Sequence, residues 1–172
     1  MADRAGAVTF KGSPLTLVGE AEVKVGQKAP DFTVSKTLLE DLKLSDLRGK
    51  TVILNVVPSL DTPVCSIQTA RFNKEAANLG DNVSIVTISM DLPVAQSRWC
   101  QANEAKAVVT ASDYKHRDFG QKFGLLIKEL GLLARAVYVL DQDGTVKHAQ
   151  VVKEVASEPD YEAALAALKQ SS

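Results

Sequence analysis

Residues 51–57 read TVILNVV, and residues 62–65, a few positions later, read TPVC. The first run is β-branched and apolar almost throughout, which is typical of a strand buried on both faces of a sheet. Thr62 followed by Pro63 resembles a helix N-cap with proline at the first helical position, so we expect a helix from Pro63 to about Leu79. Because a buried strand followed by a helix is the unit of α/β folds, this stretch predicts the fold class.

Strand-like and helix-like segments alternate from this unit to the C-terminus. Further strands are expected over residues 83–89, 108–111, 136–140 and 145–151. Further helices are expected from Pro93, near residues 119–123, and from residues 157–160 onward. The tetrapeptide DQDG between the last two strands is a hairpin signal. The pattern predicts one α/β domain over residues 1–172, with a mixed sheet flanked by helices.

The segment before residue 51 opens with another predicted hairpin. Residues 8–10 and 15–18 are β-prone, and the residues GSP between them favour a turn. Residues 29–47 are expected to be extended, up to a turn at residues 48–50.

The composition excludes several classes of protein. The chain has 172 residues, of which 45% are hydrophobic and 24% are charged, as in ordinary globular domains. A net charge of -1 provides no field to attract nucleic acid, and the apolar runs are far shorter than the roughly 18 residues that span a bilayer. The N-terminus carries Asp3 and lacks the apolar core of a signal peptide. We therefore expect a cytoplasmic protein with neither nucleic acid nor a membrane as partner.

The chain has two cysteines, Cys65 and Cys100, too few for a disulfide scaffold and wrongly spaced for CxxC motifs. If Thr62 is the N-cap, Cys65 lies in the first helical turn, where unpaired N–H groups and the helix dipole favour a thiolate. Alternatively, Cys65 is a small core residue, since Phe72 shares its helix face.

Cys100 follows Trp99 on the shorter helix, where a packed structural thiol is the ordinary expectation. A bond between Cys100 and Cys65 would restrict the unfolded chain by roughly 4 kcal/mol in the entropy model. Such a bond requires Cα atoms within about 7 Å, so one helix would have to unravel if the thiols lie farther apart.

Two polar residues are candidates to act on Cys65. Arg135 lies at the start of a predicted strand, where it either extends into solvent or stabilises a thiolate and polarises a bound oxygen. The Thr62 hydroxyl either caps the helix at the Cys65 N–H or hydrogen-bonds a thiolate and a substrate. His116 and His148 lack metal-ligand neighbours, and no dinucleotide or phosphate-binding loop motif is present, so no cofactor or metal is expected.

Residues 58–65, PSLDTPVC, resemble the P-x-x-x-T-x-x-C motif around the peroxide-reducing cysteine of peroxiredoxins. More narrowly, four other segments are similar to the bacterial thiol peroxidases, which are atypical two-cysteine peroxiredoxins. These segments are residues 8–12, 91–100, 134–137 and 158–165. The resemblance extends from Val8 to Leu168, and Trp99 stands where phenylalanine is more often expected.

The resemblance implies a thioredoxin-like fold with an N-terminal hairpin and a homodimer. By motif position it implies that Cys65 is the peroxidatic cysteine and Cys100 the resolving cysteine. It also implies that Thr62 and Arg135 are activating polar partners and that Pro58 shields the pocket.

The implied activity is that of a cytoplasmic bacterial antioxidant enzyme, a thioredoxin-dependent peroxidase. Cys65 would reduce hydrogen peroxide or an organic hydroperoxide and become a sulfenic acid, and Cys100 would condense with it to a disulfide. Thioredoxin would restore both thiols by exchange, and no metal, flavin or haem would take part. Two other classes fit two cysteines: a redox-regulated binding or holdase module, and an inert scaffold with two buried thiols.

Overall fold

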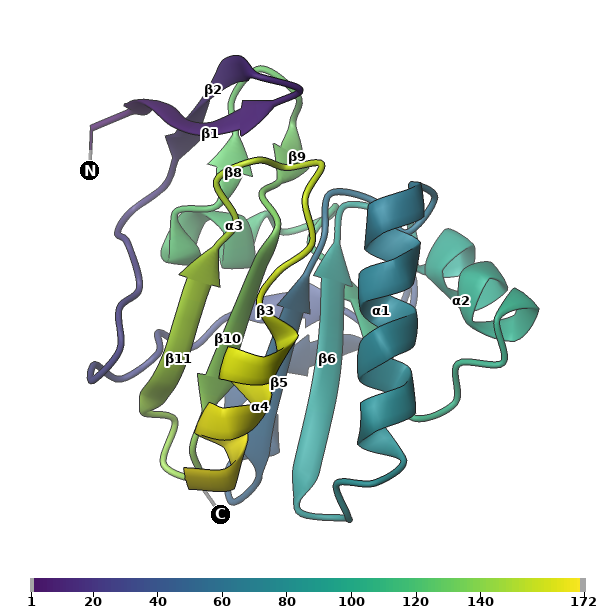
Figure 1. The fold of residues 1–172 in the computed structure, drawn as a ribbon. Coiled ribbons are helices and arrows are strands. Elements are labelled where there is room, and N and C mark those ends of the chain that lie inside the picture. Colours follow the sequence, from purple (N-terminus) through teal and green to yellow (C-terminus); the bar gives the residue numbers. More distant parts are fainter. Residues whose placement is uncertain (1, 171–172) are drawn as a thin grey trace.

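The computed structural model describes residues 2–170, which form two β-sheets and four α-helices (Figure 1). Of the domain predicted over residues 1–172, Met1 and residues 171–172 lie outside the described residues. The strands are β1 (Arg4–Phe10), β2 (Ser13–Val18), β3 (Thr33–Ser35), β4 (Asp41–Lys43), β5 (Thr51–Val56), β6 (Val83–Ser89), β7 (Val109–Ser112), β8 (Leu126–Ile127), β9 (Leu132–Leu133), β10 (Ala136–Leu140) and β11 (Val146–Val151). The helices are α1 (Pro63–Ala76), α2 (Pro93–Ala102), α3 (Asp118–Phe123) and α4 (Tyr161–Gln170), with a short 3₁₀ helix, η1 (Leu44–Leu47).

The larger sheet has seven strands in the order β11-β10-β5-β6-β7-β3-β4. The central strands β5, β6 and β7 are parallel, whereas β10 pairs with both β5 and β11 in antiparallel fashion. At the other edge, β3 is antiparallel to β7 and β4. The prediction of a mixed sheet that ends in a hairpin is confirmed.

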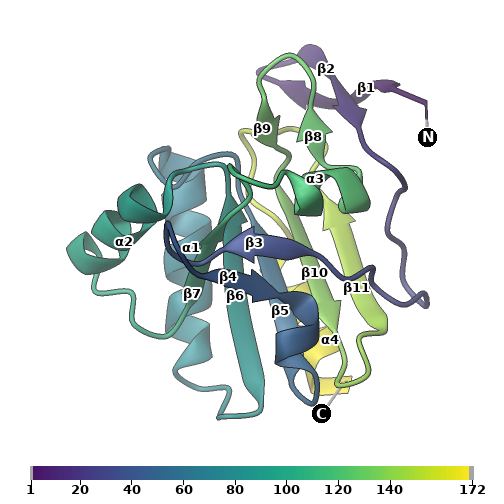
Figure 2. The same ribbon diagram turned by 180° about the vertical axis from the view of Figure 1, so that it is seen from behind.

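Strand β5 is buried along its whole length, as the sequence of residues 51–57 predicts. Successive side chains of a strand point to opposite faces of the sheet, and each face here has its own apolar cluster. Leu54 packs in one cluster with Phe119 of α3, and Ile53 packs in the other with Phe72 of α1 and Leu168 of α4. Helices α1 and α4 cover the face seen in Figure 1, and α3 lies on the face seen in Figure 2.

The two helices that carry the cysteines begin where the sequence predicts. Helix α1 starts at Pro63 and ends at Ala76, slightly before Leu79, because residues 77–79 form a turn and bend ahead of Gly80. Helix α2 starts at Pro93 and packs beside β7. No helix among residues 2–170 is long and apolar enough to cross a membrane.

The smaller sheet, of order β1-β2-β8-β9, lies beyond one end of the larger sheet (Figure 1). Strands β1 and β2 form the predicted N-terminal hairpin, whose turn places Lys11 and Gly12 at positive φ angles of 48° and 84°. Leu17 of β2 pairs with Ile127 of β8, a short strand that the sequence analysis does not predict. The hairpin is thereby attached to the body of the molecule.

The extended stretch predicted over residues 29–47 is correct only in part. It contains the short strands β3 and β4 and the helix η1 instead of one continuous segment. The chain reverses between the strands because the Glu40 carbonyl accepts hydrogen bonds from the N–H groups of Lys36 and Thr37.

Candidate active site

Cys65 lies in the first turn of α1 and is fully buried. Its sulfur belongs to a small apolar cluster with Val57 and Leu60, against which Trp99 of α2 is packed. Thr62, the N-cap, has the extended backbone that precedes a helix. Cys65 is thus both a helix-start thiol and a packed residue, so position along the helix does not separate the two interpretations.

Arg135 favours a reactive thiol at Cys65 over an inert core residue, because its side chain is only 2% exposed and ends at the sulfur. Its Nη2 donates to Cys65 Sγ at 3.1 Å, its Nη1 to Gln68 Oε1 at 2.9 Å, and its Nε to the Val155 carbonyl at 2.8 Å. Of the two alternatives for Arg135, extension into solvent is therefore wrong. The side chain turns inward from the residue before β10 and contacts α1.

The charge of this buried guanidinium has an unusual set of partners. None of the ion pairs between residues 2 and 170 includes Arg135. Its hydrogen bonds go to two neutral oxygens and to the cysteine sulfur. A buried cation is costly unless paired, and of these three partners Cys65 Sγ is the one able to carry a negative charge.

A buried polar network supports Arg135 and was missed by the sequence analysis. Gln68 accepts from Arg135 through Oε1, and its Nε2 donates to the side-chain oxygen of Asn55. Asn55 Nδ2 then donates to the hydroxyls of Thr69 and Thr87, each at 3.1 Å. The signal was present in the sequence, since Asn55 interrupts an apolar strand and must find buried partners.

Thr62 and Pro58 lie in the loop that leads into α1. The Thr62 hydroxyl is exposed and donates to the Ser59 carbonyl at 3.0 Å, and it makes no capping hydrogen bond. The expected cap at the Cys65 N–H is therefore absent, and so is a hydrogen bond to the sulfur. Pro58 is buried, as a shielding position requires.

Asp91, just after β6, holds this loop in place. Its carboxylate accepts hydrogen bonds from the Ser59 hydroxyl and the Leu60 N–H, each at 2.7 Å, and from the Ser89 hydroxyl at 2.8 Å. This role has no signal in the sequence, because it depends on two segments that meet only in the folded chain.

Cys100 is half-buried on α2, and both cysteines are free thiols. Its Sγ contacts the Thr110 hydroxyl at 3.9 Å, and it lines a groove of about 470 Å³ together with Lys36 and Ser97. Burial raises the pKa of the Cys100 thiol, and the contact with Thr110 offsets part of that rise. The structure thus gives Cys100 a hydroxyl neighbour where Cys65 has a cation.

Trp99 and Ser66 connect the two cysteine-bearing helices. The indole Nε1 of Trp99 donates to the Ser66 hydroxyl at 3.1 Å. Ser66 follows Cys65 along α1, and Trp99 precedes Cys100 along α2, so the contact joins positions adjacent to both thiols.

The histidines stand apart from this site, as the sequence suggests. His116 contacts Asp41 at 3.1 Å, and burial lowers the pKa of His148. Within residues 2–170, no group of three or more metal-ligating side chains gathers in a way that would hold an ion.

The chain is similar to known proteins along most of its length. The model of the Redoxin family matches residues 24–165. Thiol peroxidase from Bacillus subtilis is 55% identical over 162 residues, which are 94% of this chain and 96% of that protein. Thiol peroxidase from Oceanobacillus iheyensis is 55% identical over 161 residues, 94% of this chain and 97% of that protein. A crystal structure of a peroxiredoxin-like protein from Aquifex aeolicus is 38% identical, with a TM-score of 0.88 over 97% of this chain and 98% of that one.

Proposed function

The chain belongs to the Redoxin family, as a thiol peroxidase with a thioredoxin-like fold, and we propose that Cys65 is the cysteine that reduces the peroxide. The observation that carries this proposal is the 3.1 Å contact between Arg135 Nη2 and Cys65 Sγ, in a buried site where no carboxylate of residues 2–170 pairs with the guanidinium. Among the same residues, the side-chain partner of Cys100 is the Thr110 hydroxyl instead of a cation.

In the first step, the Cys65 thiolate attacks the terminal oxygen of a hydroperoxide. An S–O bond forms and the O–O bond breaks, so the sulfur is oxidised by two electrons and becomes a sulfenic acid. The departing oxygen takes a proton and leaves as water or an alcohol. Arg135 favours the thiolate before the attack and stabilises the negative charge that develops on oxygen during it.

Pro58 and Thr62 complete the proposed pocket from the loop before α1. Pro58 is buried, and we assign it the role of shielding the sulfenic acid from water and further oxidation. The Thr62 hydroxyl is exposed and bonded only to a backbone carbonyl in the described contacts. Its acceptor lone pairs are available to a hydroperoxide O–H, which would orient the substrate.

In the second step, the Cys100 thiol attacks the sulfenic sulfur, releases water and forms a Cys65–Cys100 disulfide. The two thiols have different neighbours in the reduced protein, and we propose that this step includes a movement that opens the contact between Trp99 and Ser66. An external dithiol, proposed to be thioredoxin, then reduces the disulfide by exchange. A cytoplasmic homodimer remains part of the proposal.

A coupled assay tests the proposal. The purified protein is mixed with thioredoxin, thioredoxin reductase and NADPH, and peroxide consumption is followed with hydrogen peroxide and with an organic hydroperoxide. We expect many turnovers per protein and, after oxidation without reductant, a Cys65–Cys100 bond in the mass spectrum. Consumption of only one peroxide per chain would instead indicate a redox-regulated binding module.

A further inference from the structure

The segment 152–156, between β11 and α4, lies between Arg135 and the N-terminal hairpin. The Arg135 carbonyl accepts from the Val152 N–H at 2.9 Å, and the Arg135 Nε donates to the Val155 carbonyl at 2.8 Å. The segment therefore holds Arg135 by both its backbone and its side chain.

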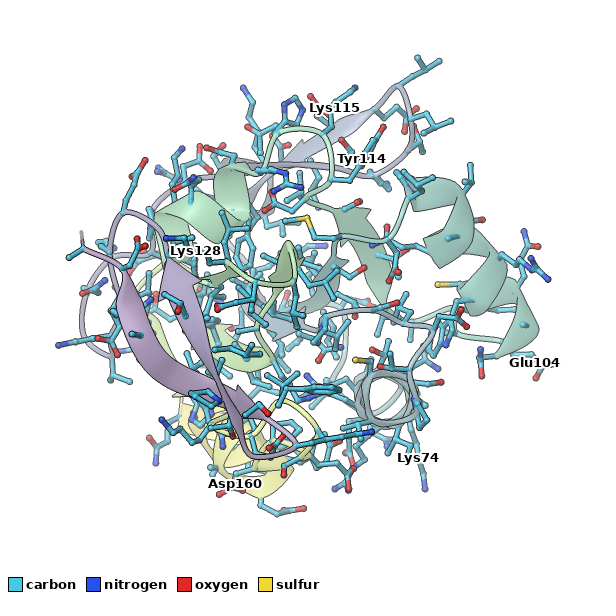
Figure 3. All side chains as sticks on the ribbon, turned by 90° about the horizontal axis from the view of Figure 1, so that it is seen from above. Lys74, Glu104, Tyr114, Lys115, Lys128 and Asp160 are labelled. Atoms are coloured by element: carbon cyan, nitrogen blue, oxygen red, sulfur yellow. The ribbon has the colours of Figure 1, made fainter. Side chains whose placement is uncertain are left out.

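The other side of the same segment is bound to strand β1. The Val155 N–H donates to the Thr9 carbonyl at 2.8 Å, and the Thr9 N–H donates to the Lys153 carbonyl at 2.7 Å. The peptide group that holds the guanidinium is thus next to one that pairs with the hairpin. Figure 3, seen from above, has the hairpin on the side nearest the viewer, and Figure 1 shows the chain between β11 and α4 rising toward that hairpin before it descends into α4.

Glu154 fastens the hairpin turn to this segment. Its Oε1 accepts from the Thr9 hydroxyl at 3.1 Å and from the Gly12 N–H at 2.9 Å, and its Oε2 accepts from the Ala156 N–H at 2.8 Å. These donors hold the pKa of Glu154 at about 2, so the carboxylate stays charged at neutral pH. The Glu154 side chain therefore links the hairpin turn at Gly12 to the Ala156 N–H, which belongs to the same peptide group as the Val155 carbonyl.

We infer that Glu154 is a positioning residue for the peroxidase reaction, and that it acts by fixing the Val155 carbonyl that orients the Arg135 guanidinium. The guanidinium is a planar fork, so the direction of its Nε bond determines where Nη2 points. Loss of that orientation moves the charge away from Cys65 Sγ without removing it. This inference rests on the proposed role of Arg135 at Cys65.

The test substitution is Glu154→Gln, which keeps the shape of the side chain but removes its charge and one acceptor oxygen. We expect the oxidation of Cys65 by hydrogen peroxide in a single turnover to slow by about tenfold, since small misplacements of a reacting group are costly. Rapid mixing measures this rate, and ultraviolet absorbance measures the thiolate fraction against pH. Thr9→Val, which removes one of the three donors, is the milder second variant and should slow the reaction less.

Glu129→Gln is the matched control. Glu129 also holds the hairpin, because its carboxylate accepts from the Thr16 N–H at 2.6 and 3.0 Å, but it lies between β8 and β9 and away from segment 152–156. Both substitutions loosen the hairpin and should lower the melting temperature. Only Glu154→Gln should slow the oxidation of Cys65.

A double-mutant cycle distinguishes positioning from general loosening. If Glu154 acts through Arg135, Glu154→Gln has no further effect on the oxidation rate in an Arg135→Ala background. A wild-type rate in Glu154→Gln, or an equal slowing in both backgrounds, would overturn the inference. Failure of wild-type Cys65 to react with peroxide would instead overturn the proposed function, so the two failures are distinguishable.

Discussion

The two cysteines occupy neighbouring helices but have contrasting surroundings. Cys65 is fully buried at the start of α1 and receives a hydrogen bond from a buried guanidinium. Cys100 is half-buried near the end of α2, borders a groove, and contacts a hydroxyl. The two sulfurs therefore differ in burial, in position along their helices and in the group that contacts them, which is a guanidinium at Cys65 and a hydroxyl at Cys100.

The contrast suits a division of labour between the sulfurs. A thiol that attacks peroxide must be ionised and held beside a group that stabilises the departing oxygen. A thiol that attacks a sulfenic acid, and is later released by an external dithiol, benefits more from an accessible position. The following predictions test this contrast, from the largest expected effect to the smallest.

Removing the first sulfur should abolish peroxide reduction. In Cys65→Ser the alcohol is essentially un-ionised at neutral pH, so we expect consumption to fall to the background rate in the coupled assay. Circular dichroism should show a folded protein. Substantial turnover by this variant would show that the contrast between the two sulfurs has been assigned the wrong way round.

Removing the second sulfur should stop recycling but spare the first step. In Cys100→Ser no other cysteine of the chain can resolve the sulfenic acid, so thioredoxin-dependent turnover should be lost. The initial oxidation of Cys65 should stay within about twofold of wild type, because Arg135 still contacts it. The coupled assay measures the turnover, rapid mixing with peroxide measures the initial oxidation, and dimedone traps the sulfenic acid for mass spectrometry. Undiminished thioredoxin-dependent turnover would contradict the assignment.

Removing the cation should make Cys65 resemble Cys100. We expect Arg135→Ala to slow the single-turnover oxidation by about a hundredfold, the usual cost of losing a donor to a developing oxyanion. The thiolate absorbance at neutral pH should fall as well. Arg135→Lys should recover the charge but only part of the rate, because an ammonium cannot reproduce the forked donor geometry. Wild-type rates in both variants would remove Arg135 from the mechanism.

The pH dependence of alkylation should show that burial disfavours the thiolate of Cys100. Burial disfavours its charged form and raises its pKa, so its thiolate is scarce at pH 7 and increases as the pH rises. In a Cys65→Ser background, the rate of alkylation by iodoacetamide should rise about tenfold per pH unit between roughly pH 7 and pH 9. A plateau that begins near neutral pH would contradict the effect of burial.

The elements around the site were predictable because their signals are local. The apolar run of residues 51–57 gives a strand that is buried on both faces, and Thr62 with Pro63 marks the start of α1. The motif around Cys65 then led to the family, which the comparisons confirm. The single domain, the homodimer and the cytoplasmic location stay predictions.

The supporting contacts were not predictable, because each depends on segments that meet only after folding. Gln68 and Arg135 are far apart in the sequence, and so are Glu154 and the turn at Gly12. The inward path of Arg135 depends on acceptors from two other elements, so its position before a strand was insufficient. At Thr62 a local signal was misleading, since the residue type favours a helix cap but the hydroxyl donates to the Ser59 carbonyl instead.

The contact between Trp99 and Ser66 also gives the protein an optical reporter. Trp99 is the only tryptophan of the chain, and its indole packs beside the Cys65 cluster while donating to a neighbour of Cys65. A separation of α1 from α2 would therefore change the surroundings of the only indole fluorophore. Its emission can follow the redox cycle in real time in the unlabelled protein.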